Sequence, residues 1–141
     1  MYKYKTAKNK NSQKDTAWRW FSKYIRLRDC LATTKTDEYC KCITCCRVVP
    51  NRDKQLHAGH MLPGRNNSIL FDETVVFGQC KRCNEYGDGE KEKFKAVMVE
   101  RNGIEWYEQK VRQKSDPCKI TNYKLISDYY REKYNELKES I

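Results

Sequence analysis

Four cysteines in two pairs, with two histidines between them, are the residues of this chain whose types and spacing are best suited to chemistry. Cys42 and Cys45 form one Cys-x2-Cys pair, and Cys80 and Cys83 form the other. Thiolates at this spacing are typical ligands of structural zinc, whose tetrahedral shell four sulfur atoms would fill. The sequence therefore predicts a structural Zn²⁺ that joins two distant segments of the chain.

The histidines lie inside the loop that this metal would close. His57 and His60 are the two histidines of the chain, and Asn84 directly follows Cys83, where a helix is expected to begin. If zinc holds the histidine strand against that helix, His57, His60 and Asn84 converge on a hard divalent ion and its water. Phosphodiester hydrolysis needs an activated water and a cation. Imidazole titrates near neutral pH, which suits the role of base.

The charge of the chain favours an anionic partner. Its 141 residues carry a formal net charge of +10, from 29 basic and 19 acidic side chains. Residues 1–41 hold much of the excess, with 11 basic and 4 acidic side chains. Such an excess usually indicates nucleic acid, although a basic solvated surface would have the same composition. The basic residues that we expect to contact DNA are Arg19, Lys23, Arg26, Arg65, Lys81 and Arg82.

The elements that must position these residues follow from pattern. Residues 1–14 have no apolar period and are expected to form a basic flexible tail. Residues 15–141 are expected to form one domain, because their number suits a single core. Apolar side chains at helical spacing predict a helix over residues 15–31. The zinc core should then occupy residues 40–90, and C-terminal helices residues 90–140.

A strand is expected over residues 56–61, and it carries both histidines. Because side chains alternate along a strand, His57 and His60 would face opposite sides of it. A bulge at Gly59 could re-aim either ring. Residues 69–71 are expected as a short extended apolar piece.

Eight cysteines can also indicate a secreted disulfide scaffold. The chain starts with residues rich in Lys and Asn rather than with a signal peptide. No apolar run is long enough for a membrane helix, so no membrane partner is expected. We therefore expect metal-bound thiolates in a reducing cytoplasm.

The same residues carry a resemblance to a known family. The Cys-x2-Cys pair, His-Ala-Gly-His at 57–60 and Gln-Cys-x2-Cys-Asn at 79–84 resemble the HNH (His-Me finger) endonucleases. More narrowly, they resemble the phage NinG/Rap recombination proteins. Residues 24–29 are similar to the N-terminal helix of that family. The resemblance covers about residues 18–114.

The resemblance implies an α+β fold, in which a zinc-stapled treble-clef or ββα-metal core has flanking α-helices. It implies that His60 activates the water and that Asn84 binds a catalytic Mg²⁺ or Mn²⁺. His57 matches a position at which a metal-ligand role is plausible. Asp72 or Glu73 could orient His60 or complete the metal shell.

The chain departs from the HNH pattern directly before the expected base. Many HNH enzymes place an acidic metal ligand at that position, and this chain has Gly59. The family also has a middle asparagine that orients the base loop, and the residue nearest that position here is Thr74. The set of ligands for a catalytic ion is therefore open at this stage.

The activity implied by the resemblance is that of a divalent-metal-dependent DNA endonuclease. It would be a phage recombination nuclease that hydrolyses phosphodiester bonds in branched DNA, in the cytoplasm of a bacterial host. Symmetric cleavage of a junction would need two active sites, which suggests a homodimer. The alternative is a non-enzymatic, zinc-stabilised DNA-binding protein or an assembly protein that docks through its tyrosine-striped last helix. The trio of His57, His60 and Asn84 favours the enzyme, because a binding module has no need of it.

Overall fold

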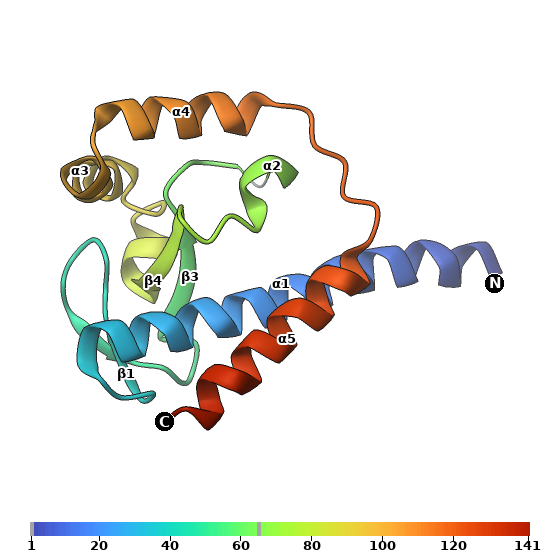
Figure 1. The fold of residues 1–141 in the computed structure, drawn as a ribbon, viewed down its shortest axis with the longest axis horizontal. Helices are drawn as coiled ribbons and strands as arrows, with labels where there is room; N and C mark the ends of the chain where they lie inside the picture. Colours follow the sequence, from blue (N-terminus) through green and yellow to red (C-terminus); the bar gives the residue numbers. More distant parts are fainter. Residues whose placement is uncertain (1, 65) are drawn as a thin grey trace.

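Long helices from both ends of the chain pack beside a centre that holds two small β-hairpins (Figure 1). The computed structural model describes residues 2–64 and 66–141, with side chains from residue 12 onward. The fold is α+β, as predicted. Its elements are α1 (Tyr2–Thr34), β1 (Tyr39–Lys41), β2 (Val48–Pro50), β3 (Leu56–His60), α2 (Asn67–Leu70), β4 (Val76–Cys80), the short π-helix η1 (Arg82–Tyr86), α3 (Lys91–Asn102), α4 (Ile104–Ser115) and α5 (Tyr123–Glu139).

The first helix is longer than its apolar pattern predicts. Residues 1–14 are expected as a flexible tail, but α1 begins at Tyr2 and runs to Thr34. Lysine and glutamine are good helix formers, and extending a helix that has already nucleated costs little free energy. An apolar period is therefore not needed for a helix there, and the segment expected as a tail is helical. Neither α1 nor any other helix of the described residues is long and apolar enough to cross a membrane.

The first and last helices share the hydrophobic core. α1 and α5 lie along each other (Figure 1), and the rings of Phe21 and Tyr130 meet edge to face at 4.8 Å. Tyr123 and Tyr130 are both buried, so part of the tyrosine stripe on α5 packs against the core. The main core comprises Phe21, Ile25, Ala58, Met61, Leu62, Ile69, Val75, Val76, Phe94, Met98 and Tyr130.

The central hairpin has a continuous antiparallel register. β3 and β4 pair from Leu56 opposite Cys80 to His60 opposite Val76, and Gly59 pairs with Phe77. No bulge interrupts β3, so a bulge at Gly59, which the sequence left open, does not occur. The first hairpin, β1 with β2, pairs in the same antiparallel sense.

A short helix replaces the extended piece expected at residues 69–71. α2 covers Asn67–Leu70, and its two apolar side chains, Ile69 and Leu70, are buried. A short apolar run fits a buried strand and a buried helical turn equally well. Tertiary packing decides between the two here, and the expectation of an extended segment is wrong.

Two adjacent charged residues fasten α1 to β4. The buried carboxylate of Asp29 accepts a hydrogen bond from the Gly78 backbone amide at 2.7 Å, and it forms a salt bridge with Arg28 at 2.7 Å. The Arg28 guanidinium also donates to the carbonyls of Glu73 (2.9 Å) and Val76 (2.8 Å). Because buried polar groups are costly unless they are paired, these bonds fix where the helix lies against the hairpin.

Candidate functional site

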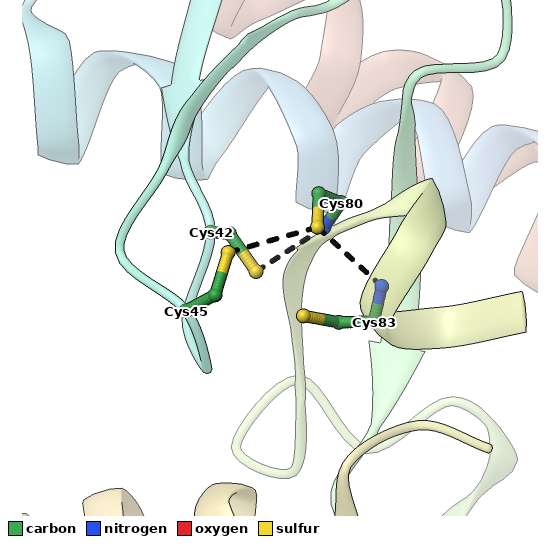
Figure 2. Close-up of side chains that lie close together, drawn as sticks. All are labelled: Cys42, Cys45, Cys80 and Cys83. Carbon is green, nitrogen blue, oxygen red and sulfur yellow. Dashed lines mark hydrogen bonds between the residues drawn. The ribbon is translucent and has the colours of Figure 1, made fainter. Parts of the chain in front are cut away.

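The four predicted cysteines come together at one point. Cys42 and Cys45 lie in the turn after β1, Cys80 ends β4 and Cys83 lies in η1 (Figure 2). Their sulfur atoms all lie within 4.8 Å of one another, and those of Cys45 and Cys80 are 3.7 Å apart. Zinc–sulfur bonds of about 2.3 Å in a tetrahedron would place sulfur atoms about 3.8 Å apart. The cysteines are thus positioned to bind a metal ion, with the donor set of structural zinc.

The surroundings of one of these sulfur atoms, that of Cys42, favour negative charge. The Cys42 sulfur accepts the Cys80 amide at 3.3 Å, and the Cys80 sulfur accepts the Cys83 amide at 3.5 Å (Figure 2). Burial raises the pKa of the Cys42 thiol, but backbone amides, including that of Cys80, and the Thr44 hydroxyl lower it to about 6. Burial and the neighbouring thiols raise the pKa of Cys83 to about 12. One thiolate forms readily, and a bound cation would be needed to deprotonate all four.

A cleft of about 460 Å³ lies beside the β3–β4 hairpin. Leu56, His57, Ala58 and His60 come from both faces of β3 and line it together, whereas no residue of β4 does. The cleft therefore follows the edge of β3 that β4 leaves unpaired, and both histidines reach it despite their alternation. Asn84 of η1 lines it as well. Its remaining lining residues are Trp18, Ser22, Arg26, Arg52, Asp53, Lys54 and Glu85.

His57 and Asn84 are in direct contact. The Nε2 atom of His57 lies 2.9 Å from the Lys54 carbonyl, and Nδ1 lies 2.9 Å from the Asn84 Nδ2. A carbonyl only accepts, so Nε2 carries the hydrogen and Nδ1 accepts from the Asn84 amide. Neighbouring ligands of an octahedral ion at about 2.1 Å lie about 3 Å apart. A rotation of the amide that exchanges Nδ2 for Oδ1 would give the pair this ligand arrangement.

Three helices position His60. Its Nε2 atom lies 3.3 Å from the Leu70 carbonyl of α2, so a neutral ring carries its lone pair on Nδ1. The Trp18 ring of α1 stacks on it at 5.1 Å, with 18° between the planes. Lys91 of α3 donates to the His60 carbonyl. Neither Trp18 nor Lys91 is among the predicted site residues, since no local pattern links them to a histidine so far along the chain.

The two acidic residues suggested as partners of His60 bind elsewhere. Asp72 pairs with Lys110 of α4 at 2.8 Å. Burial raises the pKa of Asp72, but hydrogen bonds from Lys110 and from the hydroxyl and backbone amide of Thr74 outweigh burial, so the pKa is lowered. Glu73 accepts the Tyr130 hydroxyl at 2.9 Å and pairs with Lys133 at 3.2 Å. The carboxylates thus fasten α4 and α5 to the α2–β4 loop.

The three basic residues predicted on α1 have different surroundings. Arg26 lines the cleft, whereas Arg19 is exposed and outside its lining. The Lys23 ammonium lies 5.0 Å from the centre of the Trp20 ring, as a cation–π contact requires. The structure therefore separates Arg26 from the other two.

The remaining predicted DNA contacts lie off the cleft or outside the described residues. Lys81 is half-buried and Arg82 is exposed at the start of η1, and neither lines the cleft. Arg65 lies outside the described residues. Arg52 and Lys54 do line the cleft, and sequence reasoning missed them, although their position in the loop just before the histidine strand is a usable signal.

Gly59 has a packing reason that accounts for the missing acid before His60. A Cβ atom there would overlap the Oε1 of Gln79 and lie 3.0 Å from its Cβ. Gln79 is fully buried, and its amide donates to the Gly89 carbonyl at 2.8 Å, so it cannot easily move. A side chain before His60 has no room in this chain.

Gly59→Ala is therefore expected to lower the free energy of unfolding by about 1–3 kcal/mol, the usual cost of overpacking. Chemical denaturation of the two proteins at equal metal content measures the difference. Gly59→Asp should be worse, because it also buries a charge. A Gly59→Ala midpoint equal to that of the wild type would mean that Gln79 is mobile.

The fold and site define a small α+β protein with four cysteines positioned to bind a metal ion and a cleft lined by two histidines and an asparagine. Residues 1–140 match the sequence profile of the family described as "Bacteriophage Lambda NinG protein". The chain belongs to this NinG family. A search of the curated proteins found no match, and neither did a search of the solved structures.

Proposed function

We propose that this protein is an HNH-type, divalent-metal-dependent DNA endonuclease with a treble-clef or ββα-metal core. The observation that carries the proposal is the cleft, into which His57, His60 and Asn84 all open. The Asn84 amide donates to Nδ1 of His57 at 2.9 Å, so the two side chains are neighbours, and both would reach one hard cation if the amide turned its oxygen to the ion and this hydrogen bond gave way to the metal. A protein that only binds DNA needs none of these residues.

In this proposal the cysteines have a structural role, and the residues of the cleft carry out the hydrolysis. A zinc ion on the four cysteines holds η1 against the first hairpin, and because Asn84 directly follows Cys83, the zinc fixes Asn84 as well. His57 and Asn84 would hold Mg²⁺ or Mn²⁺, and such an ion would stabilise charge on the phosphate oxygens. His60 accepts the proton of the attacking water at Nδ1, while the Leu70 carbonyl holds its other nitrogen at 3.3 Å.

The substrate we propose is DNA, and branched recombination intermediates in particular. The basic side chains at the cleft, Arg26, Arg52 and Lys54, suit a phosphate backbone. Membership of the NinG family and the recombination proteins that the motifs resemble both support a phage protein acting in the cytoplasm of a bacterial host. Two cuts across a junction would require two copies, so we include a homodimer in the proposal.

A second candidate function rests on the four-cysteine site. A metal-stabilised fold and a net charge of +10 would suffice for a non-enzymatic DNA-binding or assembly protein. On α5, Leu125 and Tyr129 are exposed, whereas Tyr123 and Tyr130 are buried. The surface left for docking is thus smaller than the whole tyrosine stripe.

A cleavage panel tests the proposal directly. The purified protein is incubated with a four-way junction, a D-loop, a flap, single-stranded DNA and linear duplex, each with Mg²⁺, Mn²⁺ or EDTA. We expect metal-dependent cleavage, strongest on a branched substrate. Folded protein that binds these DNAs and cuts none of them with either metal would support the non-enzymatic alternative.

A further inference from the structure

One wall of the cleft is a single face of α1. Trp18, Ser22 and Arg26 follow one another at intervals of four residues, so they share a face of the helix, and all three line the cleft. Trp18 stacks on His60. Arg26 is the one charged residue that α1 contributes to the described lining, and it lies two helical turns from Trp18.

The Arg26 side chain is held in place without using all of its donors. Its Nε donates to the Ser22 carbonyl at 3.2 Å, and one terminal nitrogen lies 3.5 Å from the Asn51 side-chain oxygen. Both partners are neutral acceptors. A guanidinium has five N–H donors, so most of its hydrogen-bonding capacity is available to a ligand.

The charge of Arg26 is partly desolvated and has no carboxylate partner. The side chain is half-buried, and burial lowers its pKa. The described side chains include every Asp and Glu of the chain, and Arg26 forms a salt bridge with none of them. The two acidic residues of the cleft lie close to other basic groups: the Asp53 carboxylate is 3.7 Å from the Arg52 guanidinium, and the Glu85 carboxylate is 4.0 Å from the His57 ring.

A desolvated charge is costly unless an opposite charge pairs with it. The folded protein nonetheless holds this guanidinium toward the cleft, so an anionic ligand would recover the lost solvation. Guanidinium is planar and donates in parallel pairs, which matches two oxygens of one phosphate.

We propose that Arg26 binds the phosphate group that is cut, and that it therefore acts in catalysis rather than in the general grip on DNA. This inference rests on the proposed nuclease function of the same cleft. Arg26 pairs with the phosphate from the α1 side, opposite the residues of β3 and η1. A fixed positive charge there stabilises the negative charge that develops on the phosphate oxygens during attack.

The test compares Arg26→Gln with Arg112→Gln, which removes the same charge from an exposed position on α4 outside the cleft. At saturating DNA, Arg26→Gln should cut about 10²–10³-fold more slowly than wild type, the usual loss of one charge-stabilising donor. The slope of the logarithm of its DNA-binding constant against the logarithm of the salt concentration should become shallower by no more than about 0.9, the contribution of one phosphate contact. Arg112→Gln should cut at the wild-type rate, and Arg26→Lys at an intermediate one.

A second readout needs no cleavage. The Nε–H of Arg26 is hydrogen-bonded, so its NMR signal can be followed while a short junction DNA is added without divalent metal. A shift upon binding supports the phosphate contact, also if Arg26→Gln fails to fold. An unmoved signal overturns the inference, as does a folded Arg26→Gln that cuts as fast as Arg112→Gln. If the wild type cuts nothing, the nuclease proposal fails, and this signal alone decides whether Arg26 contacts phosphate.

Discussion

Replacing His60 with alanine is expected to slow DNA cleavage by about 10²–10⁴-fold, the range that a general base contributes. DNA binding should stay close to that of the wild type, because the basic side chains of the cleft, rather than the His60 ring, are the groups proposed to hold the phosphate backbone. Single-turnover cleavage of the preferred substrate gives the rate, and a mobility-shift assay in EDTA gives the affinity.

His57→Ala is the informative partner for this experiment. If His57 binds the catalytic ion, its loss should raise the Mn²⁺ concentration needed for half-maximal cleavage, whereas His60→Ala should stay slow at any Mn²⁺ concentration. Because the His60 ring packs on Trp18, the unfolding midpoint of each variant is measured alongside. Equal rates for wild type and a folded His60→Ala would remove His60 from the mechanism.

Cys83→Ser is expected to release the structural metal and to unfold the protein at ambient temperature. Zinc binding in zinc-finger peptides is worth about 10–16 kcal/mol, which is comparable to the net stability of a typical domain, about 5–15 kcal/mol. The four sulfur atoms lie within 4.8 Å of one another, so without a bound cation their thiolates would repel one another. Metal analysis of the purified protein and far-UV circular dichroism measure the two effects.

Cys118→Ser is the matched control, because this cysteine is exposed and lies outside the cluster. It should keep one metal ion per chain and the circular dichroism of the wild type. Cys42→Ser should behave like Cys83→Ser. Wild-type protein that is folded but contains no metal would overturn the proposed zinc site, however well the four sulfur atoms are arranged.

Strong local patterns predicted much of the fold. C-terminal helices are expected over residues 90–140, and α3, α4 and α5 occupy that range. The strand that carries the histidines is expected over residues 56–61, and β3 covers Leu56–His60. The pattern failed where different conformations suit the same residues: α2 replaces an extended piece, and α1 extends back through a polar segment to Tyr2.

The candidate site divides in the same way. The cysteine pairs are predicted by spacing alone, because a shared metal imposes that spacing on the chain. Trp18 and Lys91 could not be predicted, since their contacts with His60 depend on how α1 and α3 pack. The sequence does not explain why Gly59 stands where an acidic residue is usual, whereas the structure does: Gln79 on the neighbouring strand leaves no room for a side chain there.

The packing of α1 against α5 has a consequence for synthesis of the protein. α1 ends at Thr34, whereas α5 begins at Tyr123, so the first helix leaves the ribosome long before its partner is translated. Until then, Phe21 lacks the Tyr130 ring that covers it at 4.8 Å. All four cysteines of the cluster precede α5, up to Cys83. Chain termination before Tyr123 would therefore leave the cysteine cluster intact but the core open, exposed to aggregation and proteolysis.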